Sequence, residues 1–574
     1  MSEFGIKINN YLSGVLYSYN LGVRNRLDGK PAMLTNSLFT DFLKENGLNI
    51  YKGDSTRDVI CIEFTCGAKS YEEEIKESKK RIKEWTNSLS ENRISSEEYE
   101  RYVSNEEKLQ EETEKNKEKY KKISKENIRI EYYTNGVGIN YNVYNKNGEI
   151  VNTEYIHYKM LYRTAGKAKK GSCMFIRDEL YDKAHEFLTM GIDMPFECAP
   201  IVEMGAYSSL ITSSIIGKVQ IKPEEILVID DVDSFMTTNV VSIETDSDRH
   251  CKVLHKDNYK LKNTMFDGQA LIDSSIFPEW GDGYILLRHH MCKMAAFSTN
   301  IQTFFKDYYG DAYEYAVIED RFGNQHLVKE IKLITTENAM KWKSFGVSYD
   351  YWLEWVRKNN CMFGIVKTAH ESKFGEVQRM SYQMVNALDI DTMDSTLECS
   401  KQFIDRLKND DEFFLQYLKD NENFSNDYKV LVALCEHNPD FVNCDYFRDR
   451  RKIITYTYLM DLKVGKLIQP ADNLVIVGSP YAMLLHSVNE SVENDDTFEC
   501  EDDCIQCYTG RFNDGEYLAG FRSPFNGRAN MDYLHNHYDE RFERYFNLGK
   551  QIIAVNMLHT CFQDKNNGLT KWVG

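Results

Sequence analysis

Short stretches with a two-residue alternation of hydrophobic and polar positions recur along this chain and predict several β-rich regions. The segment "DVICIEFTCG" (residues 58–67) has this pattern, and "QIIAVNMLHTCF" near the C-terminus has the composition of a strand. Strand and turn signals also dominate residues 250–345 and residues 463–514. The pattern therefore predicts β structure at both ends and in the middle of the chain.

Between residues 69 and 127 the pattern changes to widely spaced apolar residues among many charges. The segment "YEEEIKESKKRIKEWTNSL" places five apolar side chains on one helical stripe: Tyr71, Ile75, Ile82, Trp85 and Leu89. A second charged stretch follows the break at "ENRISSEE". These features predict an antiparallel helical hairpin that projects from the body. It is either a solvated insertion or a device for gripping nucleic acid or another partner.

Helical and strand signals are mixed in the centre of the chain. We expect strands in "IRIEYYTNGVGINYNVYNKNGEIV", and a basic loop, a strand and a helix in "KAKKGSCMFIRDELYDKAHEFLTMG". Helices are expected in "SYDYWLEWVRKNN", "VQRMSYQMVNALDI" and "STLECSKQFIDRLKNDDEFFLQYLKD". The predicted fold is α+β, with these parts: a β-rich region 1–68, the hairpin 69–127, a mixed region 128–249, a β unit 250–345, a helical connector 346–462, and a second β unit 463–574.

Composition narrows the classes of function. The 574 residues carry a formal net charge of −19, which argues against a protein that coats nucleic acid but allows a local basic channel. We see no signal peptide and no membrane-spanning run, so we expect a cytoplasmic protein with reduced cysteines. The densest cysteine group is Cys500, Cys504 and Cys507. It lacks a fourth zinc ligand at ribbon spacing, which favours strand thiols over a metal site.

The stretch "GYILLRHHMCKMAAFSTNIQTFF" concentrates cations inside apolar sequence. Arg288, His289, His290 and Lys293 fall within six positions, and burying such groups is costly unless an anion is present. Neighbouring histidines in a strand point to opposite faces and rarely share one metal ion. The stretch therefore indicates an anionic ligand for Lys293, with burial in a core as the alternative.

Two further stretches carry candidate ligand contacts. In "GIVKTAHESKFGEVQRMSYQMVNAL", Lys367 and Lys373 lie in a loop, while Arg379 and Gln383 are expected one helical turn apart. In "YLAGFRSPFNG" a strand ends on Arg522 before a proline, which suits a phosphate or ribose contact but is also an ordinary strand end. Alternate aspartates occur at three places where a turn or a helix end explains them: Asp231/Asp233, Asp246/Asp248 and Asp389/Asp391.

The order of these stretches resembles that of the double-psi β-barrel RNA polymerases, most closely the single-chain RNA-dependent RNA polymerases of the RNA-silencing type. A strand headed by "DG" comes first, followed by a lysine-bearing strand, "SYQMVNAL", "GKLIQPADNLVIVG" and "AGFRSPFNG". This resemblance covers about residues 260–565. The segments "YEEEI", "VKTAHESKFG", "QRMSYQMVNALD" and "GFRSPFN" also resemble an uncharacterised group of Firmicutes proteins over essentially the whole chain.

The resemblance implies two double-psi-like β-barrel units and a nucleotidyltransferase that synthesises RNA 5′ to 3′. It assigns Lys293 and Arg522 to the active centre, with nucleoside triphosphates and RNA or single-stranded DNA as partners and no membrane. The complete enzyme of this family uses Mg²⁺. Further contacts to substrate are expected from these residues: Arg288, Lys367, Lys373, Arg379, Gln383 and Asn526.

One departure from the family pattern bears on activity. The family holds its metal with three alternate aspartates shortly after the "R.P" loop, whereas here "DKNNG" leads into unrelated residues before Gly574. We therefore expect a scaffold that is inactive alone and incomplete in its second barrel, whose missing part a C-terminal fragment chain could supply. The alternative is a non-catalytic nucleic-acid-binding or structural remnant.

Overall fold

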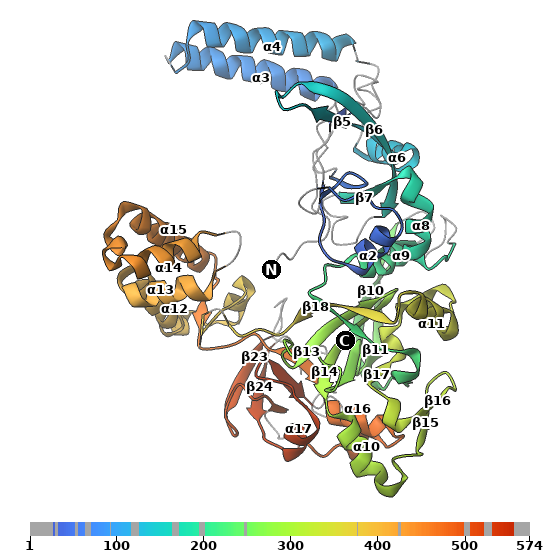
Figure 1. The fold of residues 1–574 in the computed structure, drawn as a ribbon. Helices are drawn as coiled ribbons and strands as arrows, with labels where there is room; N and C mark the ends of the chain where they lie inside the picture. The colour runs from blue at the N-terminus through green and yellow to red at the C-terminus, as the bar shows by residue number, and fades with distance from the viewer. Residues whose placement is uncertain are drawn as a thin grey trace. The chain divides into compact units, whose positions relative to one another are not determined.

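The computed structural model has an α+β fold that divides into two compact units. One unit comprises residues 2–215 and 344–347, and the other comprises residues 216–343 and 348–574 (Figure 1). The structure describes these residues: 27–28, 32–51, 55–63, 71–91, 93–115, 117, 125–162, 172–193, 201–245, 250–372, 374–375, 377–422, 426–498, 505–521 and 531–555.

The first unit is built on a five-stranded sheet with the order β1-β5-β6-β7-β4. Its strands are β1 (Leu27–Asp28), β4 (Val59–Glu63), β5 (Val137–Tyr144), β6 (Ile150–Tyr162) and β7 (Ser172–Arg177). The helices are α2 (Leu38–Glu45), α6 (Lys125–Asn135), α8 (Asp178–Thr189) and α9 (Ile201–Ser208), and a small ladder joins β2 (Ala32–Met33) to β3 (Ser55–Thr56). The strand predicted in "DVICIEFTCG" is confirmed as β4, and its apolar residues Ile60 and Ile62 are fully buried.

The strand predicted to begin at "IRIEYY" is wrong, because this segment belongs to helix α6. The helix ends at Gly136, whose φ of +69° is in the left-handed region that favours glycine, and whose N–H bonds to the carbonyl of Tyr132. Tyr132 packs in the core of the sheet with 2% of its surface exposed. Packing of this face overrides the strand propensity of isoleucine and tyrosine.

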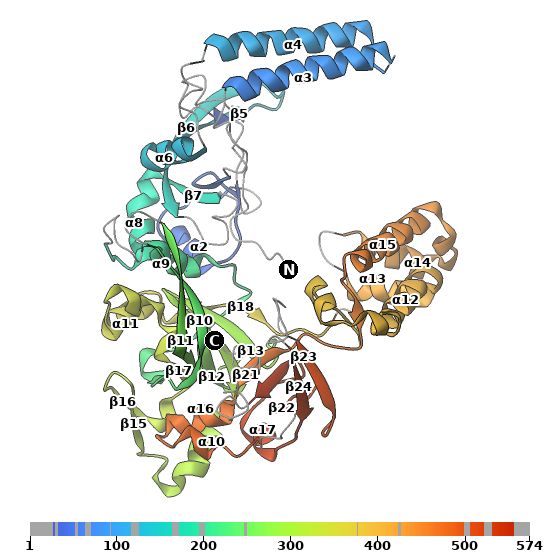
Figure 2. The ribbon, with the colours of Figure 1, turned by 180° about the vertical axis from the view of Figure 1, so that it is seen from behind.

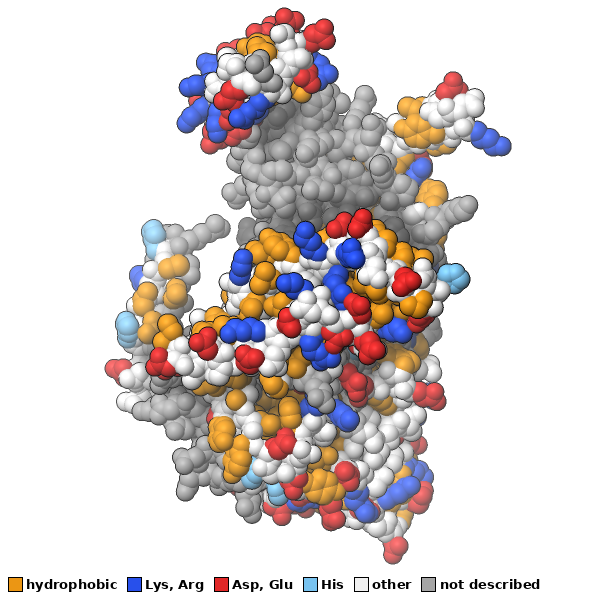
Figure 3. Space-filling view, turned by 90° about the vertical axis from the view of Figure 1, so that its left-hand side faces the viewer, with side chains coloured by type: hydrophobic (Ala, Val, Ile, Leu, Met, Phe, Trp, Pro, Cys, Tyr) orange, Lys and Arg blue, Asp and Glu red, His pale blue; other side chains and the backbone are white. Residues whose placement is uncertain are grey.

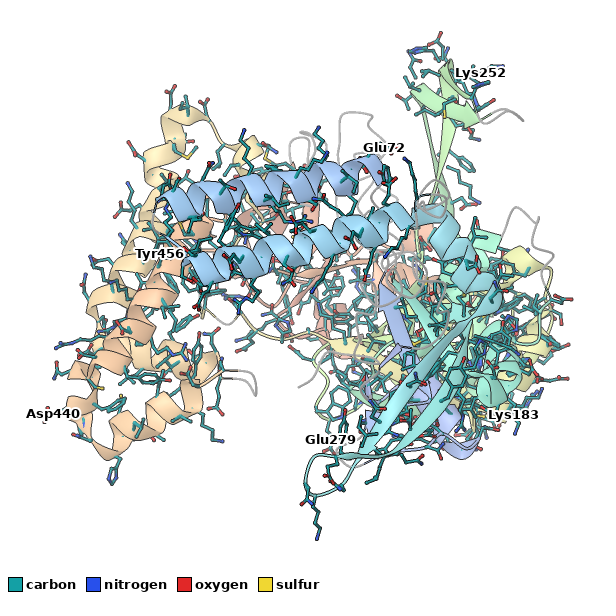
Figure 4. All side chains as sticks on the ribbon, turned by 90° about the horizontal axis from the view of Figure 1, so that it is seen from above. Glu72, Lys183, Lys252, Glu279, Asp440 and Tyr456 are labelled. Carbon is teal, nitrogen blue, oxygen red and sulfur yellow. The ribbon has the colours of Figure 1, made fainter. Side chains whose placement is uncertain are left out.

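The charged segment forms two helices, α3 (Tyr71–Ser90) and α4 (Ser96–Lys115), which lie side by side (Figures 1 and 4). Trp85 stacks on Tyr102 with ring centroids 5.1 Å apart, and Arg81 donates to Glu106 at 2.8 Å. Side chains of both charges cover the end of the hairpin at the top of Figure 3. The predicted apolar stripe is half-buried between the helices, together with polar contacts that the pattern did not indicate.

The second unit begins with a seven-stranded sheet of order β8-β18-β13-β14-β12-β17-β9. The strands are β8 (Gly217–Gln220), β9 (Ile226–Ile229), β12 (Gln269–Asp273), β13 (Tyr284–His289), β14 (Cys292–Thr299), β17 (Leu333–Thr336) and β18 (Met362–Thr368). The predicted limits of 250 and 345 leave out β8, β9 and β18. The sheet therefore takes strands from outside the expected β unit, because pairing across the sheet depends on contacts distant in sequence.

Other elements of this unit surround or leave the sheet. A long antiparallel ribbon consists of β10 (Asp233–Thr245) and β11 (Cys251–Thr264), and β15 (Val317–Glu319) pairs with β16 (Gln325–Leu327). Helices α10 (Ile301–Tyr309) and α11 (Tyr349–Lys358) also belong to it, and α11 confirms the helix predicted in "SYDYWLEWVRKNN".

A helical module follows, with α12 (Met393–Asn409), α13 (Asp411–Asp420), α14 (Tyr428–His437) and α15 (Asp445–Lys463), which Figure 2 shows gathered together. The helix predicted in "VQRMSYQMVNALDI" is wrong. This segment forms the short strand β19 (Gln378–Arg379), paired with β20 (Ile468–Gln469), and a 3-10 helix over Tyr382–Ala387. Ser381 caps that 3-10 helix by accepting from the N–H of Gln383.

The chain then forms a five-stranded sheet of order β21-β25-β22-β24-β23. The elements are β21 (Val475–Gly478), α16 (Pro480–Ser487), β22 (Ile505–Tyr508), β23 (Tyr517–Phe521), β24 (Met531–Asn536), α17 (Glu540–Tyr545) and β25 (Ile552–Val555). The last of these confirms the first part of the strand predicted in "QIIAVNMLHTCF", whose residues 556–562 lie outside the described residues. The sheets are curled like half-barrels, with seven and five strands where two six-stranded units were expected.

One hydrophobic core joins the seven-stranded and five-stranded sheets. Leu271 and Phe297 of the first sheet belong to the same buried cluster as Val477 and Ile552 of the second. The side chain of Gln269 donates to the carbonyl of Gly478 at 3.1 Å and accepts from its N–H at 3.0 Å. The two β regions therefore fold around shared contacts, although Gln269 and Gly478 are 209 residues apart in sequence.

Two global features of the described residues bear on the sequence predictions. No helix in the described ranges combines the length and apolar character that crossing a membrane requires. None of the nine cysteines of these ranges forms a disulfide bond, the buried Cys507 included, while Cys500 and Cys504 lie outside the described residues.

Candidate functional site

The two faces of the seven-stranded sheet differ sharply beyond the shared core. On one face, residues from four neighbouring strands are buried: Val219, Phe363, Leu287 and Met294. The residues that alternate with them lie on the opposite face, since successive side chains of a strand point to opposite sides. On that opposite face Tyr284 and Phe297 enter the shared core, partly buried apolar residues pack beside them, and charged side chains lie further along the strands.

Three cations occupy one register row of this polar face. Arg288 on β13 lies directly opposite Lys293 on β14, and on its other side opposite Gly364 on β18. Gly364 in turn lies opposite Lys218 on β8. Directly opposed residues share a face, so these cations cross four strands on one side of the sheet.

A fourth cation joins this group through a turn. Lys341 donates to Asp267 at 3.4 Å and to the side chain of Asn338 at 3.1 Å. Asp267 and Gly268 form the "DG" turn before β12, and the carbonyl of Gly268 accepts from the N–H of Ala295 beside Lys293. We call Lys218, Arg288, Lys293 and Lys341 the cationic row.

The electrostatics of the cationic row favour an anion. Partial burial, together with the charges of Lys341 and Arg288, lowers the pKa of Lys293 below its ordinary value. Burial also lowers the pKa of Arg288, whose guanidinium donates to the carbonyl of Leu287 at 2.8 Å. Within the described part of the chain, neither Arg288 nor Lys293 forms an ion pair with a carboxylate. Like charges held together in this way are stabilised by a bound anion.

Lys367 belongs to the same face as the cationic row. It lies on β18 opposite Leu286, and the register between β13 and β18 shifts between Leu286 and Leu287. Because Leu286 and Arg288 are two residues apart on one strand, Lys367 is a diagonal neighbour of Arg288. Lys367 was predicted in a loop but lies near the end of a strand, and its side chain is exposed.

Arg379 and Gln383 are not part of this arrangement. Arg379 lies on β19 and forms an ion pair with Asp461 at 2.6 Å, and Asp461 also accepts from Lys466 at 2.9 Å. Gln383 lies in the 3-10 helix, so the predicted spacing of one helical turn between the two residues is wrong. The ion pair links β19 to the end of helix α15, which is a structural role for Arg379.

Three predicted site residues, Lys373, Arg522 and Asn526, lie outside the described residues. Strand β23 ends at Phe521, directly before Arg522, as the sequence pattern predicted. The expected cleft shared by Lys293 and Arg522 therefore stays a prediction.

The carboxylates of the described residues do not fit a magnesium site. Across these ranges, no three His, Cys, Asp or Glu side chains are grouped so that they could hold a metal ion. Asp233 pairs with Lys262 at 2.6 Å, and Asp389 accepts from the N–H of Asp391 in a helix cap. Near the cationic row, Asp267 is already paired with Lys341. Asp233 and Asp389, one member of each of two predicted pairs, therefore have local structural partners.

His289 and His290 lie in the core rather than at the cationic row. Both are fully buried, and His289 packs against Trp352 and Phe363. Burial, with a smaller effect of His290, lowers the pKa of His289 well below its ordinary value, so this ring is neutral near pH 7. Burial also raises the pKa of Cys292 to about 12, which makes it an unreactive thiol.

A separate apolar pocket of about 710 Å³ lies between the segment after β19 and the C-terminal sheet. Its lining includes Met380, Met384 and Leu388 on one side and Leu518 and Phe521 on the other. None of its lining residues belongs to the cationic row, so the "SYQMVNAL" segment packs beside β23 and not at the cations.

Sequence reasoning found Arg288, Lys293 and Lys367 but missed Lys218 and Lys341. Lys218 follows a glycine in "IIGKVQI", and Lys341 lies in "ENAMKWK", and neither stretch has a recognisable motif. Only the register of β8 and β18 and the turn at Asp267 bring them to the row. No protein-family model matches the chain, and no curated protein matches it significantly.

Proposed function

We propose that this chain binds the phosphates of a nucleic acid strand along the cationic row, as part of an RNA-polymerase-like nucleotidyltransferase scaffold. The observation that carries the proposal is the row itself, in which Lys218, Arg288 and Lys293 share one register line on a polar sheet face. Within the described residues Arg288 and Lys293 form no ion pair with a carboxylate, and such cations are the usual means of neutralising phosphates. Asp267, a carboxylate beside the row, is already paired with Lys341.

The length of the row favours a strand over a single triphosphate. From Lys218 to Lys293 it crosses three strand spacings, which is about 14 Å at roughly 4.8 Å per spacing. Neighbouring phosphates of one nucleic acid strand advance about 3.4 Å along a helix axis, so several phosphates match this length. Gly364, which has no side chain, leaves space between Lys218 and Arg288.

The polymerase part of the proposal rests on the resemblance and on the shared core. We take the seven-stranded and five-stranded sheets as the counterparts of the two double-psi barrels, with Lys293 on the first and Arg522 after β23 of the second. In phosphoryl transfer the protein mainly positions reactants and neutralises charge, which suits this residue set. Lys293 and Arg288 would hold phosphates, and Arg522 would contact the sugar of an incoming nucleotide.

Non-catalytic binding of nucleic acid is the second candidate function. It is favoured by the local partners of Asp233, Asp267 and Asp389. Because each of these carboxylates already has a partner, the three do not form a shared metal site. The net charge of −19 predicts weak overall affinity in either case, because the rest of the chain repels a polyanion.

The binding proposal is tested by fluorescence anisotropy with a labelled single-stranded RNA over a series of salt concentrations. We expect Arg288→Gln/Lys293→Gln to weaken binding by about tenfold or more and to reduce the salt slope by roughly 1.4, at about 0.7 per lost phosphate contact. Lys329→Gln/Lys332→Gln is the matched control. It removes two cations from the same unit that are paired with Glu314 and Glu225. Equal losses in both variants would refute a specific role for the row.

A second assay separates catalysis from binding. Nucleotide incorporation is measured with labelled triphosphates, Mg²⁺ and either a primed or an unprimed template. We expect no incorporation by the chain alone. Incorporation that Lys293→Gln abolishes and the control variant retains would support a complete nucleotidyltransferase and reject the non-catalytic alternative.

A further inference from the structure

The ribbon formed by β10 and β11 is a two-stranded sheet separate from the two larger sheets of the second unit. The two strands pair antiparallel from Asp233↔Thr264 to Thr245↔Cys251, with a register shift between Thr238 and Val240, and no third strand joins them within the described ranges. Figure 4 shows one end of the ribbon at the label Lys252. Both long edges therefore present the backbone N–H and C=O groups that point away from the partner strand.

The two edges of the ribbon differ in charge. Residues 234–243 of β10 include no Asp, Glu, Lys or Arg, and they are rich in β-branched side chains. Strand β11 instead carries a lysine at four positions: Lys252, Lys256, Lys260 and Lys262. Lysine on an edge strand opposes pairing with another chain, and a long uncharged edge invites it. The β11 edge is protected in this way, whereas the β10 edge is not.

Apolar side chains near the end of the ribbon are also exposed. Val241 is 62% exposed and Ile243 is 69% exposed on β10, and Val253, directly opposite Ile243, is 59% exposed. Isolated exposed apolar residues are common, but three neighbours on one ribbon face form a patch that a partner can cover. The patch adjoins the uncharged edge.

We propose that β10 pairs antiparallel with β10 of a second copy of this chain, so that two ribbons form one four-stranded sheet across a two-fold axis. Antiparallel pairing of a strand with its own copy is the symmetric arrangement that closes a dimer. The uncharged stretch 234–243 meets itself without like-charge repulsion, whereas pairing through β11 would place lysines opposite lysines. A strand of 13 residues offers about 44 Å of edge at roughly 3.4 Å per residue.

The test compares two matched substitutions by sedimentation velocity and light scattering on the full chain. Val241→Lys places a charge on the uncharged strand, and Val253→Lys makes the same change at a similar exposure on the lysine-bearing strand. We expect the native chain and Val253→Lys to have twice the mass of one chain, and Val241→Lys to have the mass of one chain. Circular dichroism and thermal unfolding check that both variants stay folded.

Hydrogen exchange supplies a second readout. In the dimer, amide groups of residues 234–243 that point away from β11 should exchange more slowly as the protein concentration rises, and those of β11 should not change. A native chain that stays monomeric at its highest soluble concentration would overturn the proposal. The proposal would then be wrong even if a different protein covers this edge. Equal effects of the two lysine substitutions would also overturn it, because they would indicate association through the ribbon face and not through the β10 edge.

Discussion

At the scale of single residues, charge and burial separate two groups that adjoin in sequence. Arg288 and Lys293 face the polar side of the sheet. His289, which follows Arg288 in β13 and points to the other face, is fully buried against Trp352 and Phe363. One face of the strand therefore serves the proposed ligand, and the other serves the core. The two groups should respond to different experimental variables, ionic strength for the cations and pH for the histidine.

We predict that His289 makes stability depend on pH below about 6.5. Its folded-state pKa is lowered by burial, so below pH 6.5 the unfolded chain binds a proton that the folded chain does not. The free energy of unfolding should then fall with decreasing pH, by up to about 1.4 kcal/mol per pH unit from this group, until the folded-state pKa is reached.

The measurement is urea unfolding between pH 7.5 and pH 5 for the native chain, His289→Leu and the control His437→Gln. His437 is exposed at the end of α14. The pH slope should become shallower in His289→Leu and stay unchanged in the control. An unchanged slope in His289→Leu would contradict a buried neutral ring.

At the scale of elements, the approach of the two sheets depends on a glycine. Gly283 precedes β13, has a φ of +64°, and its carbonyl accepts from the N–H of Ser298 at 2.9 Å. A Cβ atom at this position would overlap the carbonyl oxygen of Leu548, next to β25. Backbone of the second sheet therefore lies directly against backbone of the first, which only glycine permits.

We predict that Gly283→Ala destabilises the second unit by roughly 2–5 kcal/mol, combining backbone strain with a clash against backbone. Gly515→Ala is the control, because Gly515 also has a positive φ, of +79°, but an added Cβ would meet no atom within 4 Å. Denaturant unfolding should give the control a loss of only about 1 kcal/mol. Similar losses in the two variants would show that strain alone, without close packing of the sheets, explains the effect.

At the scale of the whole molecule, the chain combines cores with very different contents. The shared core of the two sheets contains large apolar side chains such as Phe266, Phe297 and Phe305. The contact between α3 and α4 instead depends on Trp85, Tyr102 and the Arg81–Glu106 pair, and its fully buried side chains include Ser78. The hairpin is thus held by its own contacts, which contribute little to the cores of the sheets.

We predict that replacing residues 71–115 by a short Gly/Ser linker leaves the thermal unfolding of the second unit unchanged, within about 2 °C. The reason is that the apolar stripe of the hairpin is narrow and is covered by packing between its own two helices. Differential scanning calorimetry provides the measurement, and Trp85→Ala, which weakens only the helix–helix contact, is the companion variant. Loss of cooperativity in the deletion variant would show that the hairpin belongs to a larger core.

Residue spacing was enough to predict the elements whose periodicity is strong and local. The helices α3, α4, α11 and α12, the strands β4 and β25, and the α+β class follow from residue spacing, because amphipathic stripes and alternation arise from backbone geometry alone. The sequence also indicated Arg288 and Lys293 as candidate ligand contacts, because burying a cation within apolar sequence costs free energy unless it has a partner.

Features that depend on pairing between distant segments could not be predicted from local patterns and are visible only in the tertiary structure. The "IRIEYY" segment became helix α6 because of the core that Tyr132 enters, and "VQRMSYQMVNALDI" became a strand and a 3-10 helix because β20 pairs with β19. The cationic row required the register of β8, β18, β13 and β14, which places Lys218 and Lys293 on one register line although their positions are 75 apart in the sequence. Sheet register is set by the packing of whole faces, and a shift of one residue in the pairing of one of these strands would move the cation of that strand to the buried side.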